Sequence, residues 1–580
     1  MKPKSLILVG LSVIVLLLAA CAQQAAPPQP AEKIVTQVVE KEVTTVVEVQ
    51  KEVTTVVEVV ATPDRSTDPR FGGTFKPAAR ALVQFDQALS SDGPSFEAMS
   101  LIHGYLYRMQ DFGDPIPDIA ESWEWKNDTT LVFHLRHGVM FQDGNEVFPE
   151  GQGREVTADD VVYSMERWAT LPGSKITSDV KDVYDSIEAV DKYTVQLNLK
   201  KPSGGLFDQV NGLSNLAIIP HEAVEHYGDD FGKHPVGSGP FEFVEYVPDD
   251  HLLVKRNEDY WLQCFLDEIY LQIIPDDTVA LVALEAGDVD FVSNVPGAEV
   301  DRIATDKRFN IYYRPSKTPR MIMFPSGVQD FQDKRFRQAI AVAIDSQANG
   351  PAVYGAVAEP GCGNLSKGLP GHVADLCEKY FPYDPEQAKA LFAELGWTDS
   401  NSDGVLDKDG KPMEPIKVNT FNIAGLDKVL EIVVTQLKAV GVPAEPELVE
   451  FGTWSDMYIS GAEDSQTNER RLMLWAGCGG PGGLQLCWAK DASFGKVLGY
   501  NDSKVFDLVA QANETVDTDK RDGILQQAEE KLFGDYWVIN ATGPVGALMA
   551  SRKYVKDYGS RYHFDNVCTL NNNVWLDKQK

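Results

Sequence analysis

Hydrophobic and polar positions alternate along some short stretches of this 580-residue chain and recur every three or four residues along others. Strict alternation predicts strands at residues 131–135, 193–199 and 241–246. Helical spacing of the apolar residues predicts helices at residues 157–168, 279–284, 333–344, 384–396 and 426–440. Strands and helices mixed in this way along one chain predict an α/β fold with mixed sheets.

The residues at the ends of these helices support the assignment. Thr157 is a typical N-cap residue, and Asp159 and Asp160 follow it in the first turn, where carboxylates are favoured. Pro385 suits a first helical position, because proline lacks the N–H that would have no partner there. Glycines at 287, 396 and 441 stand where three of the predicted helices end.

The longest apolar run, Leu6 to Leu17, follows Lys2 and Lys4 and is followed by Leu18-Ala19-Ala20-Cys21. A basic start, a short apolar stretch and small residues before a cleavage point are typical of a signal peptide, and the run is short for a bilayer core of about 30 Å. We therefore expect a lipoprotein signal peptide at residues 1–20 and lipidation of Cys21. The alternative is an ordinary secretory signal in which the cysteine stands by chance.

Residues 21–68 have the composition of a tether. Ala, Gln and Pro dominate residues 22–30, which cannot bury a core, and a ten-residue sequence at 41–50 recurs at 51–60 with a change at its last position only. Valine and threonine favour a strand, but the same spacing also suits a helical stripe, so periodicity leaves both open. We interpret residues 21–68 as a lipid-anchored stalk that ends in the Pro-, Asp- and Thr-containing stretch 61–68.

The roughly 510 residues beyond the stalk exceed what one hydrophobic core usually supports, so we expect at least two lobes. No second stretch of 18 or more apolar residues occurs, and this argues against a membrane channel. The net charge of −33 argues against a nucleic-acid partner, which would need clustered lysine and arginine. We interpret the acidity as a means of solubility outside the cell.

Six cysteines remain after Cys21, and an even number in an oxidising compartment suggests up to three disulfides. Fifteen pairings are possible for six cysteines. The two closest pairs, Cys362 with Cys377 and Cys478 with Cys487, are the natural local bridges, which leaves Cys264 and Cys568 for a long-range one. No C-x-x-C pair supports the competing use of these cysteines as metal ligands.

Three short patterns invite other functions. His221 and His226 flank a sequence that resembles a zinc-protease motif, but their spacing of five places them on different faces of a helix. Residues 477–482 match G-x-G-x-x-G, yet Pro481 and Gly483 stand where a phosphate-binding helix would form, so we expect neither that helix nor phosphate binding. The sequence contains no pattern of a catalytic triad, and we expect no enzyme activity and no cofactor.

A third pattern resembles the start of a calcium-binding loop. Oxygen-bearing side chains alternate at Asp399, Asn401, Asp403 and Asp407, and a glycine stands at the sharp turn. The twelfth position is Gly410 rather than the usual glutamate. A structural calcium ion and a plain Asp/Gly turn both remain open.

Eight motifs, in the same order along the chain, are similar to those of the extracellular solute-binding proteins of family 5, which serve peptide, nickel and oligosaccharide ABC importers. They are Pro117–Trp123 (PDIAESW), Phe133–Gly144 (FHLRHGVMFQDG), Thr157–Ser164 (TADDVVYS), Pro235–Phe241 (PVGSGPF), Arg256–Trp261 (RNEDYW), Ala286–Asp290 (AGDVD), Arg335–Ile340 (RFRQAI) and Tyr383–Phe392 (YDPEQAKALF). Any one could arise by chance, but eight in order could not.

The resemblance implies a two-lobed fold of the periplasmic-binding-protein type (cluster C), in which a hinge lets the lobes close over a ligand. It implies a discontinuous N-terminal lobe at residues 69–320 and 538–580 and a middle lobe at 321–537. A Cys264–Cys568 bridge would lie within the first of these. The implied protein is extracytoplasmic, is anchored to the membrane through Cys21, and delivers its ligand to ABC permease subunits.

The ligand is less certain from the resemblance. Peptide-binding members carry an aspartate shortly after a tryptophan of the middle lobe, but here Trp475, Ala476, Gly477 and Cys478 are followed by no acid until Asp491. Trp475, Trp488 and Trp454 could stack on sugar rings or could pack in the core. We expect an oligopeptide ligand, with an oligosaccharide or another solute as the alternative and an extracellular hydrolase or adhesion protein as the other class.

Overall fold

The computed structural model divides the chain into two compact units, residues 1–68 and 69–580. It describes residues 65, 67–80, 82, 84–90, 93–109, 115–174, 183–207, 213, 216–314, 318–423, 425–462, 465–490, 492–558, 567–570 and 572–577. Cys21, the expected signal peptide and the ten-residue repeat therefore lie outside the described residues, as does Asp491. All helices and strands of the described residues belong to the second unit.

We call the part of the chain formed by residues 69–314 and 547–577 the first lobe. It is built on two main sheets. One has the order β1-β13-β12-β11, with β2 also paired to β13. Its strands are β1 Thr74–Phe75, β2 Ala78–Ala79, β11 Phe241–Val247, β12 His251–Arg256 and β13 Glu268–Ile273. The strands β11 to β13 are antiparallel neighbours, whereas β1 and β2 run parallel to β13. Helix α1, Gly93–Ile102, contacts β11 and contributes to the core under this sheet.

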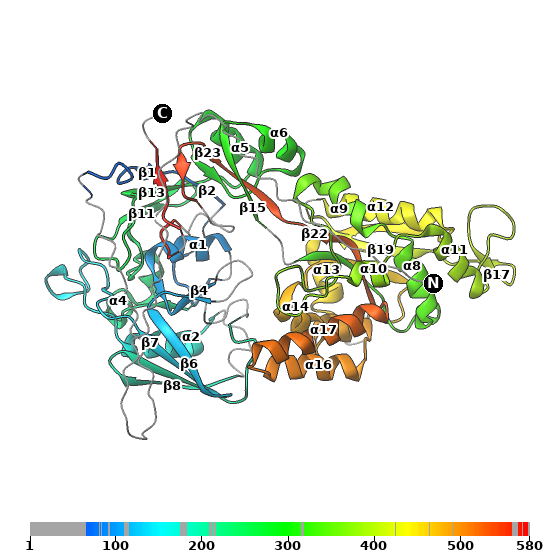
Figure 1. The fold of residues 1–580 in the computed structure, drawn as a ribbon, viewed down its shortest axis with the longest axis horizontal. Coiled ribbons are helices and arrows are strands. Elements are labelled where there is room, and N and C mark those ends of the chain that lie inside the picture. The colour runs from blue at the N-terminus through cyan, green and yellow to red at the C-terminus, as the bar shows by residue number, and fades with distance from the viewer. Residues whose placement is uncertain are drawn as a thin grey trace, which may run out of the picture. The chain divides into compact units, whose positions relative to one another are not determined.

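The other sheet of the first lobe is antiparallel and has the order β6-β7-β9-β8. Its strands are β6 Ala120–Asn127, β7 Thr130–Leu135, β8 Tyr184–Asp191 and β9 Thr194–Leu199. Helix α2, Ala158–Thr170, packs against β8 and β9 with Val161, Met165 and Trp168 buried (Figure 1). Asp160 accepts the backbone N–H of Thr157 at 2.8 Å, as the predicted N-terminal cap requires.

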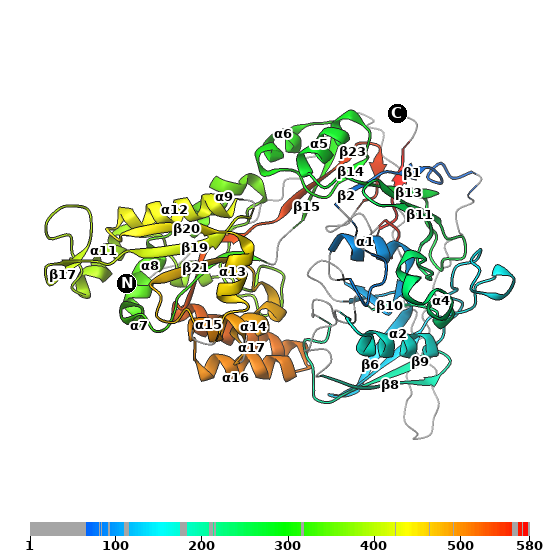
Figure 2. The same ribbon diagram turned by 180° about the vertical axis from the view of Figure 1, so that it is seen from behind.

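The middle lobe is built on a mixed sheet of order β20-β19-β21-β16-β22. Its strands are β16 Pro319–Met323, β19 Ile416–Phe421, β20 Ala444–Val449, β21 Arg471–Ala476 and β22 Val538–Pro544. Strand β19 runs parallel to both β20 and β21, whereas β16 is antiparallel to β21 and β22. Helix α12, Leu426–Ala439, lies along β19 and β20 (Figure 2) and buries Val429, Leu430 and Val433.

Two neighbouring paths of the chain connect the lobes. Strand β15, Phe309–Arg314, is followed by β16, and β22 is followed by β23, Ala547–Arg552. Because β15 pairs with β23 and β16 pairs with β22, the strands that flank the two connections lie side by side in each lobe (Figure 1). The stretch that begins at Val538 thus supplies the last strand of the middle sheet before it returns to pair with β14, Phe291–Val292, and β15. This double connection is where a hinge would lie.

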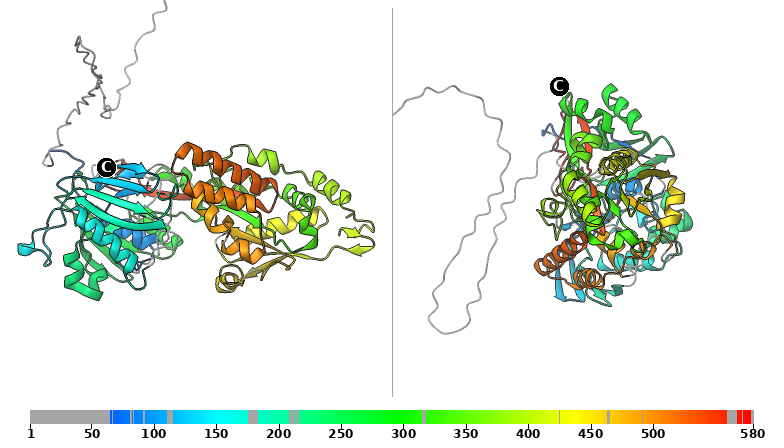
Figure 3. Two further views of the ribbon diagram at one scale, coloured as in Figure 1. Left: turned by 90° about the horizontal axis from the view of Figure 1, so that it is seen from below. Right: turned by 90° about the vertical axis from the view of Figure 1, so that its right-hand side faces the viewer.

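Helices cover the rest of both lobes, and α16 and α17 lie side by side (Figure 3). They are α4 His221–Tyr227, α5 Asp277–Ala286, α6 Val300–Thr305, α7 Gln329–Gln332, α8 Lys334–Val342, α9 Ser346–Tyr354, α10 Leu376–Tyr380, α11 Pro385–Glu394, α13 Phe451–Tyr458, α14 Gly480–Trp488, α15 Ser493–Leu498, α16 Ser503–Glu514 and α17 Thr518–Gly534. Short strands are β3 Gly104–Tyr105, β4 Tyr107–Met109, β5 Pro115–Pro117, β10 Ala217–Ile218, β17 Asp407–Lys408, β18 Lys411–Pro412, β24 Val555–Lys556 and β25 Trp575–Leu576.

The predicted strands and helices are confirmed, with boundaries that differ by a few residues, whereas the expectation that no helix forms within residues 477–483 is wrong. Helix α14 begins at Gly480, inside the G-x-G-x-x-G pattern, with Pro481 in its first turn. Proline is tolerated there because its missing N–H would have no partner within the helix. The N–H of Gly480 donates to the carbonyl of Asn364 at 2.9 Å, so this donor is already used within the protein.

Three disulfides join Cys264 to Cys568, Cys362 to Cys377 and Cys478 to Cys487. This is the pairing expected from the spacing of the cysteines. The first joins residues 304 apart in the sequence and ties the C-terminal stretch to the start of β13. Among the described residues, no helix is both long and apolar enough to cross a membrane.

Candidate functional site

The carboxyl ends of the parallel strands β19, β20 and β21 meet at one edge of the middle sheet, because parallel strands end on the same side. We call this the carboxyl edge and include the segments that leave it, residues 421–426, 449–455 and 475–489. Ligands of open α/β sheets bind outside the carboxyl ends of the strands. The chain places Trp475, predicted as a ligand-binding residue, at the end of β21 on this edge.

Aromatic rings from four elements pack together at the carboxyl edge. Trp454 of α13 stacks on Trp475, with ring centroids 4.5 Å apart and planes 15° apart. Phe421, at the end of β19, lies 4.9 Å from Trp454 and 5.7 Å from Trp475, and Phe494 of α15 lies 5.6 Å from Trp475. Trp454 is fully buried, whereas Trp475 is partly exposed. The cluster therefore fixes the position of Trp475, which remains partly exposed at the carboxyl edge.

The chain turns tightly after Trp475. A β-carbon at Gly477 would lie 2.0 Å from Nε1 of Trp475, so only glycine lets the backbone pass this close to the indole. Cys478 has a φ of 59°, a conformation that side chains other than glycine seldom adopt, and its disulfide to Cys487 closes the turn onto α14. Nε1 of Trp475 has no hydrogen-bond partner among the described residues.

The buried carboxyl group of Glu529 is linked to this turn through hydrogen bonds of Asn364. Asn364, whose carbonyl accepts the N–H of Gly480, donates its own N–H to Oε2 of Glu529 at 2.9 Å. Burial raises the pKa of Glu529 to about 8, although the N–H groups of Asn364 and Leu365 oppose this shift. The carboxyl edge is thus connected through Asn364 to helix α17.

The predicted ligand-binding residues fall into two groups in the structure, one at the carboxyl edge and one buried. Trp475, Ala476 and Gly477 lie at the carboxyl edge, and Cys478 is buried in its disulfide. Trp454 is 0% exposed and Trp488 is 2% exposed, so their predicted contact with ligand is at odds with their burial. Trp454 supports Trp475, and Trp488 packs against Tyr500 with ring centroids 5.2 Å apart. Both tryptophans are core residues in this structure.

A cavity of about 460 Å³ lies between residues of the two lobes. The first lobe lines it with Lys201, Ser203 and Gly205, and the middle lobe with Gln485, Lys490 and Glu514. At its side the N–H of Gly204 donates to the carbonyl of Asn513, at the end of α16, at 2.7 Å. A β-carbon at Gly204 would lie 1.8 Å from the carbonyl oxygen of Thr515, so this contact requires glycine. The sequence does not predict this contact, for which the Gly204-Gly205 pair is the only local signal.

The motifs and the two-lobed fold agree with a comparison of the whole sequence. The pattern of the bacterial extracellular solute-binding proteins, family 5 Middle, matches residues 114–476, which is more than half of the chain. The chain belongs to this family. The expected family and the two-lobed fold are therefore confirmed.

The relatives of this solute-binding protein are named for different ligands. Oligopeptide-binding protein AppA of Bacillus subtilis is 29% identical over 393 residues, which are 63% of this chain and 67% of AppA. The dipeptide-binding protein of Escherichia coli is 26% identical over 524 residues, 83% of this chain and 92% of that protein. Heme-binding protein A of Haemophilus influenzae is 30% identical over 343 residues, 55% of this chain and 61% of that protein.

Solved structures show the same fold at lower identity. HbpA2 of Haemophilus parasuis has a TM-score of 0.72 and 21% identity, and the match covers 87% of this chain and 99% of HbpA2. AppA of Bacillus subtilis in complex with a nonapeptide has a TM-score of 0.62 and 23% identity, over 88% of this chain and 100% of AppA.

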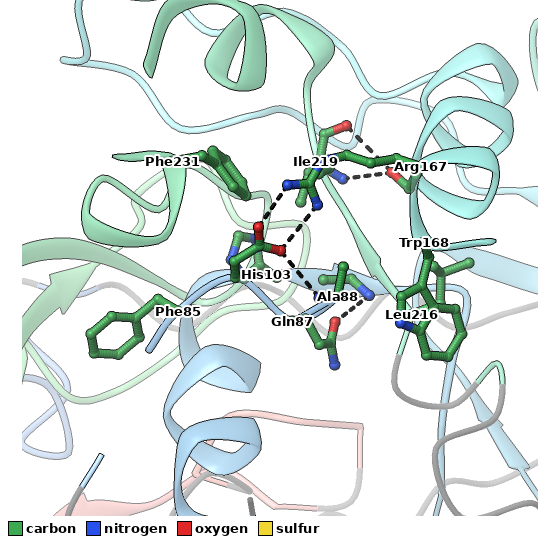
Figure 4. A pocket seen from close by; sticks show the side chains of 12 residues that line it. Phe85, Gln87, Ala88, His103, Arg167, Trp168, Leu216, Ile219 and Phe231 are labelled. Carbon is green, nitrogen blue, oxygen red and sulfur yellow. Dashed lines mark hydrogen bonds and ion pairs between the residues drawn. The ribbon is translucent and has the colours of Figure 1, made fainter. Parts of the chain in front are cut away.

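The first lobe of the solute-binding protein also holds a small polar pocket (Figure 4). The guanidinium of Arg167 donates to both carboxylate oxygens of Asp86, at 3.0 and 2.6 Å. His103 lies beside this pair and is buried, and its Nδ1 has no partner among the described residues. Burial lowers the pKa of His103 to about 4, although the Asp86 carboxylate opposes this shift. The cavity, about 20 Å³, has room for one water molecule.

The predicted calcium loop of the solute-binding protein makes its own hydrogen bonds. Asp399 accepts the N–H groups of Asp403 and Gly404, Asp403 accepts that of Val405, and Asp407 accepts both the N–H and the hydroxyl of Ser400. The carboxylates thus form Asx-type turns, as in a plain Asp/Gly loop. Within the described ranges no cluster of three or more His, Cys, Asp or Glu side chains is placed to hold a metal ion. The structural calcium stays a prediction.

Proposed function

We propose that this family member is the substrate-binding protein of an ABC importer and that it captures an oligopeptide between its two lobes. The observation that carries the proposal is the carboxyl edge, where the partly exposed Trp475 packs on a buried aromatic cluster and the segment that follows it reaches a cavity lined by both lobes at Gln485 and Leu486. The peptide class is supported by the names of two relatives, oligopeptide-binding protein AppA and the dipeptide-binding protein. In this proposal the lobes comprise residues 69–320 with 538–580, and 321–537, except that β22, Val538–Pro544, belongs to the sheet of the middle lobe.

The capture is a binding equilibrium, and no bond is made or broken. A ligand that contacts both lobes binds the closed form more tightly and shifts the population toward it. The permease would then recognise the closed form. The paired connections between β15 and β16 and between β22 and β23 supply the hinge for this motion.

An oligosaccharide is the second candidate, because a partly exposed aromatic side chain such as Trp475 suits the apolar face of a sugar. The absence of any Asp or Glu from residues 475–490 favours it over a ligand with a free amino group at this point. Thermal-shift screening of the mature protein against oligopeptide and oligosaccharide libraries separates the two. A ligand at 100 times its Kd should add about 2.7 kcal/mol to the free energy of unfolding. Stabilisation by oligosaccharides alone would contradict the peptide proposal.

We also propose that Cys21 is lipidated and holds residues 21–68 as a tether at the outer face of the membrane. The signal pattern Leu18-Ala19-Ala20-Cys21 supports this. A Cys21→Ser variant should leave the membrane fraction and be found in the periplasm or medium, whereas the unaltered protein stays with the membrane. Retention of the variant in the membrane fraction would contradict lipid anchoring.

A further inference from the structure

The three segments of the carboxyl edge are nearly free of charge, and the neighbouring strand β16 adds Arg320, the register partner of Ala476, to this edge. Its three segments, residues 421–426, 449–455 and 475–489, contain 28 residues and one charged side chain, Glu450. At the 24% of charged residues found in the whole chain, about seven would be expected there. Glu450 itself is exposed and makes no side-chain cap to α13. In a protein with a net charge of −33, these three segments thus contribute a single acidic side chain to the candidate binding site.

Each of the three segments also exposes one large apolar side chain. Phe421 and Val449 are register partners on β19 and β20, so Ile423 and Phe451 each lie two residues beyond the same pair. Ile423 is 40% exposed and Phe451 is 52% exposed. In the third segment Leu486, which lines the cavity between the lobes, is 64% exposed. Exposed apolar side chains gathered at one site mark binding surfaces, whereas scattered ones need no explanation.

The exposed ring of Phe451 belongs to the aromatic cluster of the carboxyl edge. Its centroid lies 5.0 Å from that of Phe421 in an edge-to-face arrangement and 6.4 Å from that of Trp454. Phe421 in turn contacts Trp475. The rings therefore contact one another in an unbroken apolar cluster that runs from the buried Trp454 to the exposed Phe451. This continuity with Trp475 favours the ligand, rather than a second protein, as the occupant of the surface.

We infer that the carboxyl edge, at Phe451 and Ile423, binds an uncharged apolar side chain of the ligand. This inference rests on the proposed function, because it takes the carboxyl edge as the ligand site. The physical reason is that a cationic group enclosed here would lose its hydration and would face Arg320 of β16, the register partner of Ala476, with the exposed Glu450 as the one acidic side chain of the three segments. An apolar group loses no such hydration and gains contact with the rings.

The test compares two peptides by isothermal titration calorimetry with the mature protein. One is Ala-Phe-Leu-Phe-Ala and the other is the polar analogue Ala-Ser-Gln-Ser-Ala, each with a free and with an acetylated amino terminus. We expect the apolar peptide to bind at least about tenfold more tightly, and acetylation to change its affinity by less than about threefold. Equal affinity for the two peptides, or loss of binding on acetylation, would overturn the inference.

Three variants locate the effect. Phe451→Ala should lower the affinity for the apolar peptide by about tenfold and leave that for the polar peptide unchanged. Tyr383→Ala is the matched control, since Tyr383 is similarly exposed, at 49%, but lies outside the carboxyl edge. Glu450→Gln tests recognition of an ammonium group and should have no effect. An effect of Glu450→Gln that exceeds that of Phe451→Ala would overturn the inference.

A second probe separates failure of this inference from failure of the peptide proposal. The dye N-phenyl-1-naphthylamine becomes fluorescent on apolar surfaces and is not a peptide. If neither peptide binds but the dye binds the parent protein and not Phe451→Ala, the peptide proposal fails and the apolar surface is upheld. If the dye binds both proteins equally and Phe451→Ala changes only self-association in sedimentation velocity, the surface is an interface between copies, and the inference is wrong.

Discussion

The indole rings of Trp454 and Trp475 stack face to face, with centroids 4.5 Å apart, although one ring is buried and the other is partly exposed. The pair joins the core of the middle lobe to the carboxyl edge. Because Trp454 cannot move without disturbing Phe421 and Phe494, Trp475 is held in one orientation. A binding surface fixed in this way loses little conformational freedom when a ligand arrives.

Replacement of Trp475 should weaken ligand binding. Trp475→Ala removes the exposed ring and should raise the Kd for a bound peptide by about tenfold to a hundredfold, as for other aromatic binding residues. Trp475→Phe keeps an aromatic surface and should stay within about threefold of the parent. Calorimetric titration measures both. An unchanged Kd for Trp475→Ala would mean that the ligand binds elsewhere.

The contact between Gly204 and Asn513 should matter for affinity as well. Gly204→Ala places a β-carbon against the carbonyl of Thr515 and should hold the lobes apart there. We expect a Kd raised by about tenfold, and a larger radius of gyration for the ligand-bound form in small-angle scattering. Gly297→Ala is the control, since nothing lies within 4 Å of a β-carbon there. Unchanged affinity and scattering for Gly204→Ala would show that closure does not use this contact.

The three disulfides should differ in their contributions to stability. Loss of a cross-link costs more when the loop that it closes is longer, and Cys264–Cys568 spans 304 residues against 9 for Cys478–Cys487. Replacing both members of the long-range pair with serine should therefore destabilise the protein by about 3 kcal/mol more than replacing Cys478 and Cys487. Urea unfolding of the two double variants measures the difference. An equal loss in both would contradict the chain-entropy account.

His103 should make the stability of the first lobe depend on pH. Its pKa is lowered from 6.5 to about 4 by burial, so the unfolded chain takes up a proton that the folded chain rejects. The stabilisation is complete above pH 6.5 and is lost as the pH falls toward 4, by up to about 3 kcal/mol. His103→Gln should remove this part of the pH dependence in urea unfolding. The exposed His134→Gln serves as the control and should retain it; equal slopes for both variants would contradict the assignment.

Much of the fold could be predicted because it depends on local patterns. The cap at Thr157 and Asp160, the alternation in β7 and β9, and the proline at the start of α11 act within a few residues of one another. The local disulfides follow from the same proximity, and the third from what remains. The sequence does not predict helix α14, because Pro481 usually marks the end of a helix, although proline also suits a first turn.

The candidate site was predicted less well, because its properties depend on tertiary contacts. The sequence alone does not distinguish a buried tryptophan, such as Trp454 or Trp488, from a partly exposed one, such as Trp475. The contact of Gly204 with Asn513 joins residues more than 300 apart and has no periodic signature. The exposed Phe451 also carries no local mark, since only the pairing of β19 with β20 places it beside Phe421.

The central claim is that a peptide binds at the carboxyl edge and contacts both lobes at once. Hydrogen–deuterium exchange of the mature protein, with and without a saturating peptide, tests it most directly. The account predicts that the peptide slows exchange both in residues 475–489 of the middle lobe and in residues 201–206 of the first lobe. Protection confined to one lobe, or protection that leaves residues 475–489 unchanged, would contradict it.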